Sequence, residues 1–195
     1  PFPAAMHDGA RAVQYLRHKA KDFNINPDKI GCTGGSAGAG ISLWLAFHND
    51  LADPKSEDPV LRQSTRISCA LGTQAQCSYD PRFIKKHIGG LAHEHPALPP
   101  FWGIKKDEME TEKAFKIFEE CSPITHLTAD DPPVMVTYSG NDQPSDTKPG
   151  AGIHHENFGK VLKEEMEKLK LSCEVKVGKE GGRSTLAFFS RHLLK

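Results

Sequence analysis

The sequence predicts an α/β fold in which a mostly parallel sheet is flanked by helices. Short apolar runs typical of buried strands alternate along the chain with longer runs of helical periodicity, which is the order of a parallel sheet with helices on its faces. The glycine-rich segment 34–38 stands between one such strand and the helix that follows it. A length of 195 residues suits a single globular domain, and no stretch has the composition of a linker that would divide it.

The first part of the chain contains two predicted helices on either side of a short strand. Apolar residues recur at helical spacing in 7–23 with basic residues between them, so we expect an amphipathic helix there. Residues 29–33 form a predicted strand that leads into Gly34 and Gly35. The helix predicted from 37 to about 51 has hardly any polar face, so it should be buried on most sides.

The rest of the chain contains three more strands and two more helices. In chain order these are a strand at 67–71, a strand at 134–138, a helix at 157–171, a strand at 174–177 and a helix at 184–194. The segment from Gln74 to Ala129 separates the first two of these strands. Because structureless loops of that length are uncommon in compact domains, we expect an insertion with its own structure, whose part from Tyr79 to Glu120 forms a helical cap.

The composition argues against several classes of protein. The 25 Lys and Arg residues balance the 25 Asp and Glu residues, which leaves no long-range field to attract nucleic acid or anionic lipid. No apolar run reaches the roughly 20 residues that cross a bilayer. The five cysteines show no metal-binding spacing, and we expect most of them to be buried thiols. One disulfide stays possible, and neither the compartment nor the oligomeric state is predicted.

The sharpest local feature is Gly34-Gly35-Ser36-Ala37-Gly38, a G-x-S-x-G motif. Between a strand and a helix, this motif holds a nucleophilic serine at a strained turn, and its flanking glycines avoid collisions with neighbouring backbone. The N-terminal N–H groups of the following helix face a developing oxyanion, and the Ala37 N–H is the expected first donor. The alternative is a flexible turn or the phosphate cradle of a nucleotide-binding domain, but the segment lacks the P-loop and dinucleotide patterns. We therefore predict that Ser36 is a catalytic nucleophile.

Two segments around this motif resemble the esterase and lipase family of the α/β-hydrolase fold. One is 26–38 with the helix residues 12–17 before it, and the other is Ser122-Pro123-Ile124-Thr125-His126-Leu127 with 131–134 and 138–142 after it. The resemblance implies serine hydrolysis of small carboxylic esters through an acyl-enzyme intermediate, with neither a metal nor an organic cofactor. It also implies an N-terminally truncated member, because the chain opens on the helix before the nucleophile strand and we find fewer strands than the family's sheet contains. We expect such a fragment to be poorly active by itself.

Carried over to this chain, the resemblance assigns the nucleophile to Ser36 and the acid to Asp142. A carboxylate at that strand end would orient a histidine and stabilise its imidazolium form. Asp142 stands one residue nearer to Gly140 than is usual in the family, so Asp146 is an alternative acid. Both aspartates also lie in sequences that form ordinary turns.

The histidine is where the sequence departs from the family pattern. The family's base follows the last strand, but residues 175–183 contain no histidine, and His192 is expected on the surface of the closing helix. His154 and His155 follow the acid strand and should emerge at the carboxyl edge of the sheet, where open α/β sheets bind ligands. One of them is the predicted base, or both simply cap the next helix. If neither serves, the alternative function is a catalytically weak or inactive hydrolase-like domain that binds a small ligand or partner.

The insertion contains further side chains with two interpretations each. His93 and His95, with His87 nearby, have a spacing that can share a metal, but nothing completes the set, so we expect exposed loop histidines. Phe83 and the pair Phe101-Trp102 line a substrate pocket or form the insertion's own core. The expected partner is a small-molecule ester, with no nucleic acid and no membrane span.

Overall fold

The computed structural model describes residues 1–178 and 181–194. Its centre is a sheet of four strands, β1 (Gly31–Gly35), β2 (Cys69–Thr73), β3 (Val134–Tyr138) and β4 (Cys173–Val177). Neighbouring strands are parallel, and their order in the sheet follows the chain, β1-β2-β3-β4. The predicted α/β class with a parallel sheet is confirmed.

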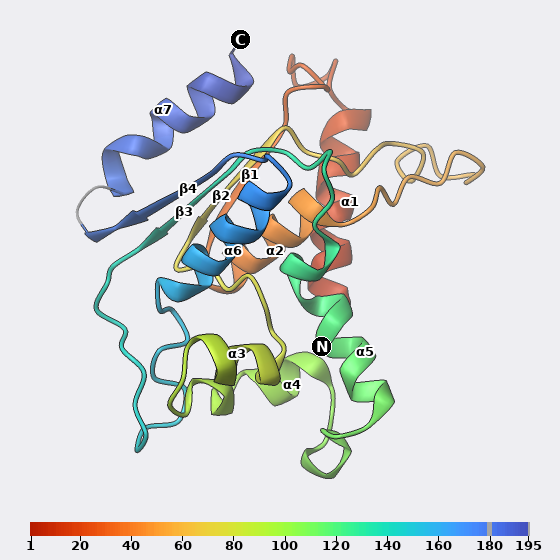
Figure 1. Ribbon diagram of the computed structural model, residues 1–195. Helices are drawn as coiled ribbons and strands as arrows, with labels where there is room; N and C mark the ends of the chain where they lie inside the picture. The colour runs from red at the N-terminus through yellow and green to blue at the C-terminus, as the bar shows by residue number, and fades with distance from the viewer. Residues whose placement is uncertain (179–180, 195) are drawn as a thin grey trace.

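Helices cover both faces of this sheet (Figure 1). On one face α2 (Ala37–Phe47) packs against β1 and β2, α6 (Asn157–Lys168) packs against β4, and α1 (Ala4–His18) packs against α2. On the other face α7 (Gly181–Leu193) lies against β2 and β3. The nucleophile motif therefore sits where the edge strand β1 turns into the largely buried helix α2.

Two of the predicted helices end four or more residues earlier than expected. The helix predicted at 7–23 is α1, which ends at His18. The helix predicted to continue to about 51 ends at Phe47, because His48 adopts an extended conformation with φ −68° and ψ 146°. His48 is thereby placed at the C-terminal end of α2, beside the segment that precedes β3.

The long segment between β2 and β3 contains short helices, as expected for an insertion with its own structure. They are α3 (Pro81–His87), η1 (Ala92–Glu94), α4 (Leu98–Trp102), η2 (Lys106–Glu108), α5 (Glu112–Cys121) and η3 (Pro123–His126). Its middle contacts the loop after β3, since Leu91 N–H donates to Ser145 O and Gly150 N–H donates to Leu91 O, both at 2.8 Å. That this segment acts as a cap stays a prediction.

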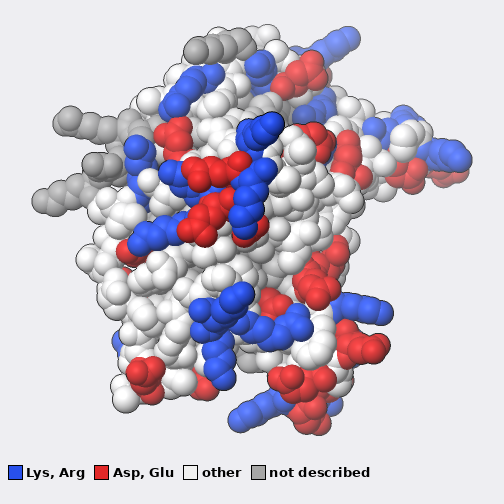
Figure 2. Space-filling view, viewed as in Figure 1, with Lys and Arg blue, Asp and Glu red and all other residues white. Residues whose placement is uncertain are grey.

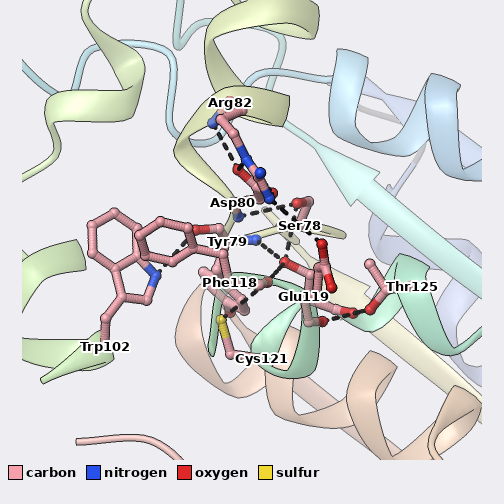
Figure 3. A network of polar contacts seen from close by, with 10 residues as sticks. Ser78, Tyr79, Asp80, Arg82, Trp102, Phe118, Glu119, Cys121 and Thr125 are labelled. Atoms are coloured by element: carbon pink, nitrogen blue, oxygen red, sulfur yellow. Dashed lines mark hydrogen bonds and ion pairs between the residues drawn. The ribbon is translucent and has the colours of Figure 1, made fainter. Parts of the chain in front are cut away.

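A buried polar network ties the start of this segment to its end (Figure 3). The Tyr79 N–H donates to Ser122 Oγ at 2.9 Å, and Ser78 Oγ lies 3.1 Å from the same hydroxyl. The indole N–H of Trp102 donates to Tyr79 O at 3.1 Å. Because an unpaired buried polar group costs about 1–3 kcal/mol, these bonds stabilise the position of Tyr79, which lines the cavity described below.

The main core lies between the sheet and the helices α1, α2 and α6. Its largest fully buried side chains include those of Trp44, Phe47, Phe118, Phe158 and Met166. All five cysteines are free, four of them buried and Cys32 half-buried, so the expectation of buried thiols holds and the disulfide left open by the sequence is not formed. These thiols act as core side chains.

The surface carries charges of both signs. Lys and Arg are interspersed with Asp and Glu on the face shown in Figure 2, in keeping with a formal net charge of zero. Within the described residues, no helix is both long enough and apolar enough to cross a membrane.

Candidate active site

Ser36 occupies the sharp turn between β1 and α2. Its backbone has φ 50° and ψ −115°, and a positive φ is uncommon for a residue other than glycine. Its N–H donates to Thr73 O at the end of β2, at 2.9 Å. A strained residue of this kind persists only where its surroundings impose the conformation, and here the strand before it and the helix after it do so.

The glycines of the motif differ in what they permit. A Cβ on Gly34 would lie 2.4 Å from the carbonyl carbon of Gly38, inside the range of real contacts, whereas a Cβ on Gly38 would meet nothing within 4 Å. Gly40, one turn into α2, packs so closely on Tyr79 that a Cβ would lie 1.7 Å from its hydroxyl. The expected collision with backbone is therefore found at Gly34, and the expectation is wrong for Gly38.

The structure brings His154 to the serine. Its Nε2 lies 2.8 Å from Ser36 Oγ, within ordinary hydrogen-bond distance. When the imidazole carries its single proton on Nδ1, Nε2 accepts the Ser36 O–H. A nucleophile and a base in direct contact form the central pair of a catalytic triad.

Asp142 holds the histidine chiefly through the backbone. The two carboxylate oxygens accept the N–H groups of Gly152 at 2.9 Å and of His154 at 2.8 Å. The distance from Asp142 Oδ2 to His154 Nδ1 is 3.6 Å, which is an ion-pair distance but longer than a hydrogen bond. Asp142 thus fixes the loop that carries the imidazole and places a negative charge beside Nδ1.

The other sequence candidates lie elsewhere. Asp146 is exposed, and in the described part of the chain no hydrogen bond or ion pair joins it to His154. His155 Nδ1 accepts the N–H of Asn157 at 3.1 Å, so this histidine caps the start of α6. His192 is half-buried rather than on the surface, with its ring 4.7 Å from that of Phe188 on the α7 face. The stretch after Val177 that lacks a histidine lies partly outside the described residues.

Burial sets the protonation of His154. The pKa of His154 is lowered below its ordinary value, mainly because burial disfavours the imidazolium; Asp142 opposes this shift and His95 adds to it. A histidine with a lowered pKa stays neutral at physiological pH. The imidazole is therefore in the form that can accept a proton.

A cavity of about 190 Å³ opens beside Ser36 and His154. It is largely apolar and is lined by Ala5, Met6, Ala37, Ile41, Gln76, Tyr79, His95, Ala97, Leu98, Phe101 and Ile153 as well as Ser36 and His154. The N–H of Ala37 belongs to the first turn of α2, where N–H groups have no acceptor within the helix. The cavity is therefore apolar, with a serine hydroxyl, an imidazole and a backbone N–H donor among its lining groups, and it suits an uncharged ligand.

Sequence reasoning found only part of this lining. Phe101 lines the cavity, as the pocket interpretation predicts. Trp102 instead packs on Phe118, with ring centroids 4.7 Å apart. Phe83 packs on His87, with ring centroids 4.4 Å apart. Gln76 was missed, although it follows β2 at the same carboxyl edge; its amide donates to Ile153 O at 2.9 Å.

His87, His93 and His95 do not form a metal cluster in the part of the chain that the structure describes. His95 lines the cavity, and His93 Nε2 lies 3.8 Å from Glu94 Oε1. Both are half-buried rather than exposed, so the expectation of exposed loop histidines is wrong for this pair. His95 lies close against the loop after β3, since a Cβ on Gly150 would be 2.7 Å from His95 Cδ2.

Comparisons with known proteins agree with this fold. Residues 1–79 match the family model described as BD-FAE. The chain is 26% identical over 141 residues to "Probable carboxylic ester hydrolase LipM" of Mycobacterium tuberculosis, an alignment that covers 72% of this chain and 30% of that protein. The chain thus spans about a third of the length of this relative.

Solved structures show the same architecture. An acetyl ester-xyloside bifunctional hydrolase from Caldicellulosiruptor lactoaceticus matches with a TM-score of 0.70 at 22% identity, over 100% of this chain and 64% of that one. A truncated form of a carbohydrate esterase from gut microbiota matches with a TM-score of 0.69 at 18% identity, over 100% of this chain and 70% of that one. By sequence the chain is similar to esterases, and by fold it is similar to solved esterases of the α/β-hydrolase type.

Proposed function

We propose that this chain hydrolyses small carboxylic esters with Ser36 as nucleophile, His154 as general base and Asp142 as the supporting acid. The observation that carries the proposal is the 2.8 Å contact between Ser36 Oγ and His154 Nε2 at a strained strand-to-helix turn. Sequence relatives described as esterases support the same class of reaction.

The proposed mechanism follows from the positions of these groups. Ser36 Oγ attacks the ester carbonyl while His154 Nε2 takes its proton, and the Ala37 N–H binds the oxyanion that forms. His154 then donates the proton to the leaving alcohol, which leaves the acyl group on Ser36. A water molecule, deprotonated by His154, attacks the acyl carbon of the acyl-enzyme. The bond from that carbon to Ser36 Oγ then breaks, His154 returns the proton to Oγ, and the carboxylic acid is released. The Asp142 carboxylate stabilises the imidazolium in both steps.

The cavity supports a short, uncharged acyl chain as the preferred substrate part. Its volume of about 190 Å³ and its apolar lining fit a group of a few carbon atoms, and no lysine or arginine is among its lining residues. A carboxylate or phosphate on the acyl side would lose its hydration there without gaining a cationic partner.

Labelling with a fluorophosphonate probe tests the nucleophile even where turnover is slow. We expect the folded chain to be modified at Ser36, identified by peptide mass spectrometry, and heat-denatured chain to be unmodified. The reason is that phosphonylation needs an activated serine rather than a complete catalytic cycle. A folded chain that stays unlabelled would instead support the alternative function, a non-catalytic hydrolase-like domain. The argument for that alternative is the absence of a histidine from residues 175–183 in the sequence.

The pH dependence of kcat/KM tests the role of His154. The neutral imidazole is the active form, so activity should fall as pH decreases through the pKa of His154, which burial places below the ordinary 6.5. The acid limb is therefore expected to have its midpoint below 6.5. Asp142→Asn removes a charge that raises this pKa, and should move the midpoint further down while lowering kcat; His95→Gln should move it up. A midpoint that responds to neither substitution would contradict the assignment of the base.

A further inference from the structure

A second cluster of ligand-type side chains lies at the opposite end of α2. His48 follows the last residue of α2, Glu120 belongs to α5 and His126 ends η3. One ligand atom from each of the three lies within 4.8 Å of the others, and the two imidazole rings are 4.7 Å apart. Three segments separated by up to 78 residues in the chain thus present two imidazoles and a carboxylate to one point.

Hydrogen bonds to backbone carbonyls determine which imidazole nitrogens carry protons. His48 Nδ1 lies 2.9 Å from Asn49 O, and His126 Nε2 lies 2.8 Å from Glu120 O. A carbonyl oxygen can only accept, so both of these nitrogens are N–H donors. The remaining nitrogens, Nε2 of His48 and Nδ1 of His126, carry lone pairs in the neutral rings.

This assignment leaves acceptors facing each other. His48 Nε2 lies 3.2 Å from Glu120 Oε1, and in a neutral imidazole both atoms are acceptors that repel unless a cation lies between them. An N–H bonded to a backbone carbonyl on the far side of the ring is the usual arrangement of a metal-binding histidine, because it fixes the tautomer and the ring orientation. His48 already has that arrangement, with Nδ1 on Asn49 O and Nε2 facing Glu120, and the backbone carbonyl of Glu120 fixes the tautomer of His126.

The surroundings also favour a cation. His48 stands at the C-terminal end of α2 and Glu120 in the last turn of α5, and helix C-termini carry partial negative charge. The guanidinium of Arg66, which lies 3.4 Å from His48 O, is engaged by Asp130 and Asp131 at 3.3 Å and 3.2 Å. The positive charge of Arg66 is therefore already balanced by two carboxylates.

We propose that His48, Glu120 and His126 bind a divalent transition-metal ion, with Zn²⁺ the best match. Two imidazoles and one carboxylate, completed by a water molecule, are a common tetrahedral zinc set with bonds of about 2.0–2.2 Å. Such a geometry holds ligand atoms roughly 3.3 Å apart, so the three side chains, whose ligand atoms lie within 4.8 Å of one another, need to approach by up to about 1.5 Å. Glu120 can do this because its side chain is 53% exposed.

The site would act on stability rather than on the chemistry at Ser36. It joins the end of α2 to the segment between α5 and η3, and the length of α2, about 16 Å at 1.5 Å per residue, separates it from the nucleophile. A bound ion would replace a repulsive contact by bonds that link two parts of the fold. The proposal does not depend on the proposed function and can be tested without an activity assay.

Zinc binding is measured at about pH 7.5 on the metal-stripped 195-residue chain, by competition with a chromophoric chelator. We expect one Zn²⁺ per chain and a Tm raised by roughly 5 °C at a hundredfold excess over Kd. His126→Gln and Glu120→Gln should each weaken binding at least tenfold, as even substitutions outside the coordination shell cost 10–100-fold. The matched controls are His18→Gln, an exposed histidine of α1, and Glu119→Gln, the neighbouring carboxylate; both should bind Zn²⁺ as the original chain does.

A second readout guards against variants that are merely destabilised. The Trp44 ring is stacked on His48 with centroids 3.9 Å apart, so Cu²⁺ at the site should quench its fluorescence. This quenching should disappear in His126→Gln while circular dichroism shows an intact fold. The proposal is overturned if the original chain binds no zinc. It is also overturned if His126→Gln and Glu120→Gln bind zinc as tightly as the controls, because the ion would then be bound by other ligands.

Discussion

Replacing Ser36 by alanine is expected to lower kcat/KM for p-nitrophenyl acetate and butyrate by at least about 10³-fold. Without the Oγ nucleophile, only the Ala37 N–H and substrate binding remain, and these account for a small part of serine hydrolase catalysis. The variant should fold normally, because alanine fills the same turn position as serine. The measurement is the initial rate of p-nitrophenol release by purified protein, with a circular dichroism spectrum of each variant.

Histidine variants give this prediction its control. His154→Ala should be as damaging as Ser36→Ala, and the double variant little worse than either, because a nucleophile and its base act as one unit. His155→Gln changes the neighbouring histidine, which caps α6, and should retain most of the activity. Retention of more than a tenth of the activity by Ser36→Ala would show that another residue performs the hydrolysis.

Gly34→Ala is expected to destabilise the fold by about 3 kcal/mol. Its Cβ would lie 2.4 Å and 2.5 Å from the carbonyl carbon and oxygen of Gly38, and backbone atoms cannot give way as the end of a flexible side chain does. Overpacking of this kind typically costs 1–3 kcal/mol, and relief requires the start of α2 to move away from β1. Urea denaturation measures the loss, and labelling of Ser36 by a fluorophosphonate should slow in parallel because the nucleophile shifts with the helix.

Gly38→Ala is the matched variant four residues along. A Cβ there meets nothing within 4 Å, and alanine in place of glycine in a helix gains up to about 1 kcal/mol. Its free energy of unfolding should be unchanged or higher. If the two variants lost equal stability, the difference would not come from the contact between Gly34 and Gly38.

The strand-to-helix turn at Ser36, the proposed nucleophile, was predictable from sequence because the residues that form it are neighbours in the chain. Glycine at 34 and a helix-forming run after Ser36 are enough to specify the elbow, whatever the rest of the chain does. Strand β3 was likewise placed at 134–138 without error, since an apolar run follows two prolines that mark its start.

The choice of base was not encoded locally. His154 and His155 are adjacent, and both follow the same strand, so sequence gives no ground to separate them. The separation comes from long-range packing: the loop folds back through Gly150 and Gly152, which have φ of 80° and 89°, and Asp142 binds its backbone. Gln76 lines the cavity for the same kind of reason, since the loop after β2 meets Ile153 only in the folded chain.

The proposed metal site is even harder to predict from sequence, because its residues meet only through long-range packing. His48, Glu120 and His126 follow no ligand spacing, and they meet because α2 ends four residues earlier than its apolar pattern indicates. The early end turns His48 toward η3. A helix boundary, which sequence patterns determine poorly, thus decides whether these side chains share a site.

The hydrogen bonds from the Gly152 and His154 N–H groups to Asp142 hold the proposed acid and base within one loop. Both residues belong to one loop of 13 residues, 142–154, and the loop is closed upon itself by its own carboxylate. Bringing Asp142 and His154 together therefore closes only a short loop, and the loss of conformational entropy on closing a loop is smaller for a shorter one. The pair meets Ser36 as a preassembled unit, so grafting residues 142–154 onto a related hydrolase scaffold should transfer the base together with its acid.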